Sequence, residues 1–78
     1  MTSTTPTGST TPEFTPRQLE VLRLIAQGLM NKEIAGKLGI KESTVVYHVG
    51  KILEKLGVDS KTKAALWAQA HGFGQPNE

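Results

Sequence analysis

The chain contains no cysteine, so neither a disulfide framework nor a cysteine-type zinc site is available to it. It also has no apolar run near the roughly 18 residues that a membrane-spanning helix requires. The first residues are mainly Thr, Ser and Pro and lack the basic and apolar regions of a secretory signal. We therefore expect no membrane partner.

Features of an enzyme are also scarce. A chain of 78 residues allows one domain, and a domain of this size has little room for an enclosed catalytic cavity. The only two histidines, His48 and His71, are too far apart in sequence for metal-ligand spacing, and no glycine-rich phosphate loop occurs. Ser43 and His48 are five residues apart on one expected helix and point in different directions. We predict no enzymatic activity and no cofactor or metal.

The charge is unevenly distributed along the chain. All nine Lys and Arg residues lie between Phe14 and Phe73, together with only five of the seven acidic residues. This basic balance favours a polyanionic partner.

Composition divides the chain into three parts. Residues 1–13 are rich in Thr, Ser, Pro and Gly and have too few apolar side chains to offset the entropy of ordering. We expect residues 1–13 to be a disordered tail or linker, residues 14–73 to form one domain and residues 74–78 to be a short tail.

Apolar periodicity and capping signals predict four helices and no strands. The first begins near Pro16 with Thr15 as N-cap and ends before Gly28. The others span about 31–38, 42–56 and 61–70, and the last has Ser60 or Asp59 as its cap. Short loops force neighbouring helices to pack on each other, so we predict an all-α four-helix bundle without a wing.

Residues 31–56 have the features of a helix-turn-helix. Gly39 suits the tight turn, Ala35 permits close helix crossing, and the third helix has an apolar inner face at 45, 49, 52 and 56. Its outward face carries Ser43, Val46, Tyr47, Gly50, Lys51 and Glu54, and the lysines around the pair of helices are Lys32, Lys37, Lys41, Lys51 and Lys55. Such a face suits the major groove, with cations for phosphate.

The stretch from Phe14 to Ala68 resembles the C-terminal DNA-binding domain of the LuxR/NarL/FixJ family of bacterial transcription regulators. The similarity is carried by FTPRQLEVL (14–22), AQGLMNKEIA (26–35), LGI (38–40), STV (43–45) with His48, and KLGV (55–58) with Ala64. It runs in one register without a gap. The resemblance implies a cytoplasmic output domain, as in response regulators, that reads promoter DNA as a dimer on inverted half-sites.

The resemblance also implies which residues act. Those expected to bind double-stranded DNA are Asn31, Lys32, Ser43, Thr44, Val46, Tyr47, Gly50, Lys51 and Lys55. The family dimerises through its last helix, which implies a homodimer interface at Ala64, Trp67, Ala68 and His71. RNA polymerase is a further candidate partner.

Four positions depart from the family pattern, and one of them is Lys51, which stands where Asn is usual. Val46 stands where the family usually has a DNA-contacting Lys. Met30 and Lys41 stand where Ser or Thr usually caps the second and third helices, and the loss of a cap costs about 0.5–2 kcal/mol unless a neighbour compensates. We expect Asn31 and Ser43 to be the substitutes.

Structural explanations compete with functional ones at several residues. We expect His48 to be a buried, hydrogen-bonded structural residue, and His71 to sit favourably at a helix end. Arg17 and Glu20 are spaced to pair, although Glu20 could instead reach another helix. Trp67 fits the core and an interface equally well.

Two other functions agree with a helix-turn-helix fold. The apolar pair Val46 and Tyr47 would suit a partner protein, in which case DNA binding would be weak or absent. The promoter-reading region of a sigma factor is the third alternative, and it would need RNA polymerase to act.

Overall fold

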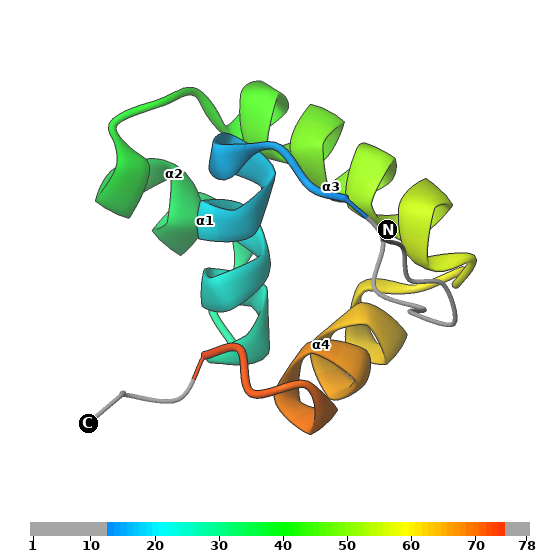
Figure 1. Ribbon diagram of the computed structural model, residues 1–78. Coiled ribbons are helices and arrows are strands. Elements are labelled where there is room, and N and C mark those ends of the chain that lie inside the picture. The colour runs from blue at the N-terminus through cyan, green and yellow to red at the C-terminus, as the bar shows by residue number, and fades with distance from the viewer. Residues whose placement is uncertain (1–12, 75–78) are drawn as a thin grey trace, which may run out of the picture.

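The computed structural model describes residues 13–74. These form four helices, α1 (Pro16–Ala26), α2 (Asn31–Leu38), α3 (Glu42–Leu56) and α4 (Lys61–Ala70) (Figure 1). The described residues contain no strand, so the predicted all-α class and helix bounds are confirmed. The tails predicted at the two ends fall largely on residues 1–12 and 75–78, which lie outside the described residues.

Two helices begin with the predicted caps. The Thr15 hydroxyl accepts the backbone N–H of Gln18 at 3.1 Å, and the Gln18 side chain accepts the N–H of Thr15 at 3.0 Å. This reciprocal pair satisfies two backbone donors that a helix N-terminus leaves without partners. At α4 the Ser60 hydroxyl accepts the N–H of Lys63 at 3.1 Å, which identifies Ser60 as the cap.

The other two helices lack such caps. Their N-cap residues are Met30 and Lys41, and neither side chain makes a capping hydrogen bond. Asn31 and Ser43, the expected substitutes, are already inside the helices. The prediction that they act as caps is wrong, because a cap needs non-helical backbone before the first helical residue.

Glycine ends α2 and α3 in the left-handed conformation. Gly39 has φ 68° and Gly57 has φ 71°, values that side chains strongly disfavour. The N–H of Ile40 then donates to the carbonyl of Ala35 at 3.1 Å, which closes the end of α2 and directs the chain into α3. The tight turn of the helix-turn-helix depends on this geometry.

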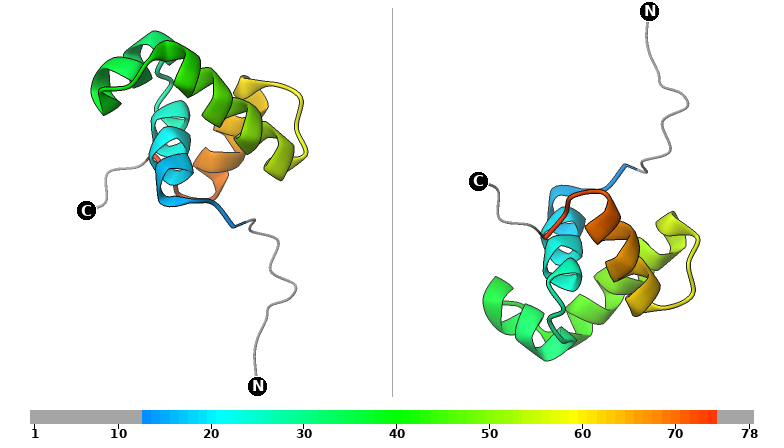
Figure 2. Two further views of the ribbon diagram at one scale, coloured as in Figure 1. Left: turned by 90° about the horizontal axis from the view of Figure 1, so that it is seen from above. Right: turned by 90° about the horizontal axis from the view of Figure 1, so that it is seen from below.

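The core lies around α1, which packs against all three other helices, while α3 extends from α2 to α4 (Figure 2). The largest fully buried side chains of the core are Val21, Leu22, Ile25, Ile34, Val45 and Ile52. Full burial of one such side chain is worth about 1.5–3 kcal/mol. On α4 the core positions are Ala64 and Ala68, whose small size allows close packing. No helix of the described residues is long and apolar enough to cross a membrane.

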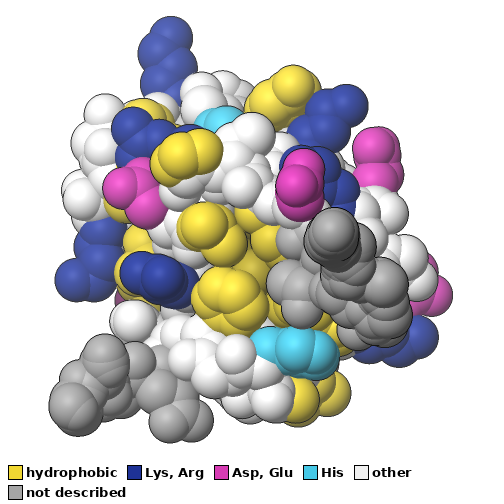
Figure 3. Space-filling model, viewed as in Figure 1, with side chains coloured by type: hydrophobic (Ala, Val, Ile, Leu, Met, Phe, Trp, Pro, Cys, Tyr) yellow, Lys and Arg dark blue, Asp and Glu magenta, His cyan; other side chains and the backbone are white. Residues whose placement is uncertain are grey.

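The end of α4 and the residues after it pack against the end of α1. The side chain of Gln69 donates to the carbonyl of Ala26 at 2.8 Å, and Phe73 and Phe14 both pack on Trp67, with ring centroids 5.9 and 6.3 Å from its ring. Trp67 is half-buried, so it belongs to the edge of the core and also to the surface. Hydrophobic side chains gather in the middle of the face viewed in Figure 3, with charged side chains around them.

Candidate nucleic-acid interface

Helix α3 presents one face to the core and the opposite face to solvent. Val45, Val49 and Ile52 are buried on the inner side. Helix α2 packs beside α3, and the turn at residues 39–41 fixes the angle between them. These buried residues fix α3 to the core along most of its length, so the outward face has a defined position, as a recognition surface requires.

The outward face carries most of the predicted DNA contacts. Val46 is 53% exposed and Tyr47 is 60% exposed, and Ser43 and Lys51 are also exposed. Gly50 lies one turn after Val46 and is partly exposed. Thr44 is half-buried between the two faces and offers less of its surface to a partner.

Lys51 does not project alone into solvent. Its ammonium lies 5.6 Å from the centroid of the Tyr47 ring, within the range of a cation–π contact, and 4.0 Å from the carboxylate of Glu54. Because both partners are on the same exposed face, these contacts are weak and can yield to a phosphate.

The first turn of α2 offers backbone donors. The N–H of Ile34 is bonded to the carbonyl of Met30 at 2.9 Å, and the N–H of Met30 donates to the carboxylate of Glu33 at 2.7 Å. The amides of Asn31, Lys32 and Glu33 lie between these and have no intrahelical acceptor. Lys32 is exposed and Asn31 half-buried at this end. Such a turn favours an anion.

Lys55 is positioned differently from Lys51. Its ammonium donates to the carbonyl of Glu13 at 2.7 Å and to Oε1 of Gln18 at 2.8 Å, and it lies 5.6 Å from the Phe14 ring centroid. The side chain thus joins the end of α3 to the capping box of α1. Its contact with DNA stays a prediction, because two of its ammonium hydrogens already donate to Gln18 of α1 and to Glu13 just before that helix.

The surface of α4 differs from the predicted interface. Ala64 and Ala68 have no exposed surface, because both lie in the core. A partner cannot reach them, so the prediction that they belong to the dimer interface is corrected. His71 is exposed and stacks on Trp67 with ring centroids 3.9 Å apart. Leu66, which sequence reasoning left out of the interface, is 60% exposed. The apolar composition of α4 was the signal, but it did not reveal which residues face outward.

The remaining single-residue predictions have mixed outcomes. Arg17 and Glu20 form the predicted ion pair at 2.9 Å. His48 is half-buried as expected for a structural residue, but its Nδ1 is buried without a hydrogen-bond partner among the described residues, so the expected hydrogen bond at that atom is absent. The ring lies edge-on to Tyr47, with centroids 5.5 Å apart.

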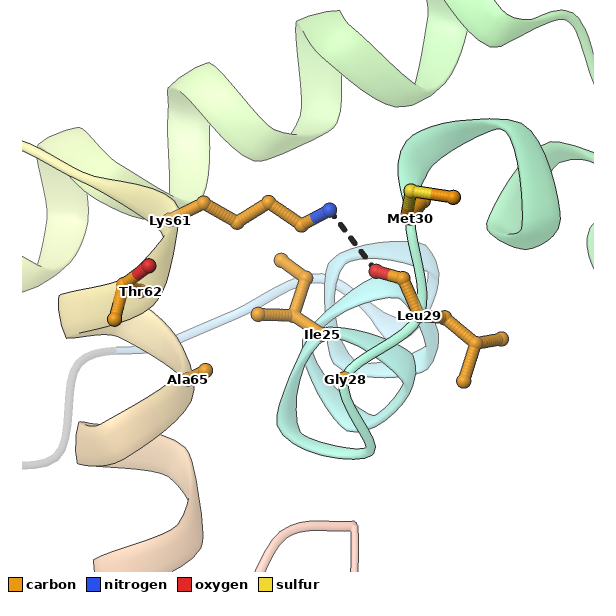
Figure 4. A pocket seen from close by; sticks show the side chains of 7 residues that line it. All are labelled: Ile25, Gly28, Leu29, Met30, Lys61, Thr62 and Ala65. Carbon is orange, nitrogen blue, oxygen red and sulfur yellow. Dashed lines mark hydrogen bonds between the residues drawn. The ribbon is translucent and has the colours of Figure 1, made fainter.

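A shallow pocket of about 210 Å³ lies between the loop after α1 and the start of α4. Figure 4 shows the Lys61 side chain extending across it, with its ammonium bonded to the carbonyl of Leu29 at 2.9 Å. Ile25 and Ala65 contribute to its mostly apolar lining. Within residues 13–74, no group of three or more His, Asp or Glu side chains is arranged to hold a metal ion.

The buried inner stripe of α3, its exposed outer face and the glycine turn from α2 define a helix-turn-helix domain of the kind that binds DNA. The family model for bacterial regulatory proteins of the luxR family matches residues 12–68. The chain belongs to this family, whose members are DNA-binding transcription regulators and not enzymes.

Similar proteins include response regulators from several bacteria. The chain is 51% identical over 55 residues to the nitrate/nitrite response regulator protein NarL of Escherichia coli, a match that covers 70% of the chain and 26% of NarL. It is 47% identical over 62 residues to the transcriptional regulatory protein YxjL of Bacillus subtilis, covering 80% of the chain and 28% of YxjL. For the response regulator protein VraR of Staphylococcus aureus the identity is 44% over 62 residues, covering 80% and 30%. The chain therefore spans little more than a quarter of the length of these relatives.

Proposed function

We propose that this domain binds duplex DNA sequence-specifically, with α3 in the major groove, as the output domain of a transcription regulator. The observation that supports it best is the outward face of α3, where exposed side chains at 43, 46, 47 and 51 stand opposite a fully packed inner face. A groove about 12 Å wide admits a helix with such a face. Because the chain spans only 26% of NarL and 30% of VraR, we further propose that this domain works within a longer regulator whose other domain controls dimerisation.

Phosphate contacts flank this helix in the proposed complex. The unpartnered amides at the start of α2 and the exposed Lys32 would bind one phosphate, and Lys51 would leave Glu54 to bind another. No salt bridge within residues 13–74 involves Lys32, Lys37 or Lys41, so these cations need no rearrangement before they meet a phosphate.

Two copies would bind inverted half-sites about one helical turn apart. We place the contact between them on the accessible side of α4, where Leu66, Trp67 and His71 offer apolar and aromatic surface. Large apolar side chains exposed in a monomer are typical of such contacts. Contact with RNA polymerase would use surface that the DNA leaves uncovered.

Fluorescence anisotropy with labelled duplexes tests the proposal. A duplex selected from a random pool is compared with random duplex at two salt concentrations. We expect preference for the selected duplex and affinity that falls with salt, because each neutralised phosphate releases counterions. Absence of salt-sensitive binding by the folded domain, even when it is fused into a dimer, would refute the proposal.

One observation favours a different function. Val46 and Tyr47 form an exposed apolar pair without a cation between them, which would also suit a protein partner. In that case the selection would recover no preferred duplex, and substitutions at these two residues would change binding to a protein and leave DNA unaffected.

A further inference from the structure

The middle of the outward face of α3 is apolar. More than half of the surface of Val46 and of Tyr47 is exposed, whereas Val45 and Val49 are buried on the opposite side of the helix and anchor it to the core. Exposed aliphatic and aromatic side chains at the centre of a recognition helix cannot form the bidentate hydrogen bonds by which Arg, Lys, Asn or Gln read bases. Val46 therefore offers only apolar contact, and Tyr47 offers an aromatic ring whose single hydroxyl cannot make a bidentate contact.

The space next to this pair is open. Gly50 follows Val46 by one helical turn, and a Cβ built at Gly50 would meet no atom within 4 Å. The groove floor can therefore approach the helix backbone closely at this point, and the side chain of Val46 can reach further between base edges than it could beside a longer residue.

The nearest cation supports the aromatic ring. The Lys51 ammonium lies over the Tyr47 ring, with 5.6 Å to its centroid, and 4.0 Å from the carboxylate of Glu54. The positive charge of Lys51 thus lies beside the Tyr47 ring, more than one helical turn after Val46 along α3. Base contact and phosphate contact are thereby assigned to different residues.

Only one group in the major groove is apolar, the 5-methyl group of thymine, and all other base edges present donors or acceptors. An apolar side chain against those edges would leave them without hydrogen bonds, which disfavours every other base. We propose that Val46 and Tyr47 read thymine methyl groups, so that A·T pairs occupy the centre of each half-site. This inference rests on the proposed function and adds the kind of base that is read.

The test replaces thymine by deoxyuridine, which lacks the methyl group and keeps every hydrogen-bonding atom. Each thymine of the selected duplex is replaced in turn, and the affinity is measured by anisotropy. We expect a three- to fourfold loss, on the order of one buried methyl group, at one or two thymines in each half-site and none elsewhere. In the Val46→Ala variant that loss should shrink toward onefold at the thymine that Val46 contacts.

The control is Lys32→Gln, which lies on α2 and should weaken binding to the thymine and uracil duplexes by the same factor. Circular dichroism confirms that both variants are folded, which is expected because both side chains are exposed. Selective DNA binding without an effect of deoxyuridine at any position overturns this inference and leaves the proposed function intact. Lack of salt-sensitive binding to any duplex overturns the proposed function itself, and this inference with it.

Discussion

Replacing Lys55 by methionine separates two roles for this residue, one in the fold and one on DNA. Methionine keeps an apolar stem and removes the ammonium, which donates to Glu13 and Gln18 at 2.7 and 2.8 Å. Hydrogen bonds to a charged group are worth about 1.5–3 kcal/mol, and an exposed cation–π contact about 0.5–1 kcal/mol. Because Lys55 is exposed, hydrogen bonds to water replace much of this interaction energy in the variant. We therefore expect the free energy of unfolding to fall by about 1.5 kcal/mol. For a domain of this size that lowers the Tm by roughly 6–12 °C.

The matched control is Lys51→Met, one turn earlier on the same helix. Within residues 13–74 its ammonium has only the Tyr47 ring and the Glu54 carboxylate at 4.0 Å as partners, so the Tm should change little. Thermal unfolding by circular dichroism gives both Tm values, and anisotropy over a salt series gives the slope of log affinity against log salt. We expect Lys51→Met to reduce that slope by about 0.9, the value for one phosphate, and Lys55→Met to leave it unchanged. An unchanged Tm with a reduced slope for Lys55→Met would refute this reasoning and make Lys55 a phosphate contact.

Three further substitutions test other parts of the molecule. Val46→Lys adds a cation to the groove and should strengthen DNA binding, chiefly at low salt, with a slope steeper by about 0.9; unchanged or weaker affinity would mean that α3 does not enter the groove in the family's manner. Leu66→Glu, at a 60% exposed position, should leave the Tm almost unchanged and abolish cooperative binding to paired half-sites, as measured by sedimentation with DNA; retained cooperativity would place the dimer contact elsewhere. Ser60→Ala removes the α4 cap and should cost about 1 kcal/mol in urea unfolding, whereas a loss below a few tenths would show that water replaces the hydroxyl.

The helices could be predicted from sequence because each boundary has a local chemical cause. Thr15 and Pro16 start α1, and Gly39 and Gly57 end α2 and α3 in a conformation that other residues disfavour. Apolar spacing along α3 identified its buried face in the same way. These signals act over one or two helical turns, so they can be recognised in the sequence without knowledge of the tertiary structure.

The site could be predicted only in part, because burial depends on partners distant in sequence. On α4, Ala64 and Leu66 belong to the same apolar stretch, yet one is fully buried and the other largely exposed. The packing of α4 against α1 and α3 decides between them. Lys55 is a similar case, since its acceptors Glu13 and Gln18 are 42 and 37 residues away and its spacing on α3 looked suitable for phosphate.

The glycine in the middle of α3 gives the domain room to change. A helix-interior glycine is less stable than alanine by roughly 0.8–1.0 kcal/mol, and a Cβ added at Gly50 would meet none of residues 13–74 within 4 Å. Alanine can therefore be introduced there with a gain in folding stability, and the longer side chain of another good helix former would project beside Val46. Position 50 is thus a natural starting point for evolving new operator preferences, because variants there begin with a stability reserve that can offset less favourable changes elsewhere.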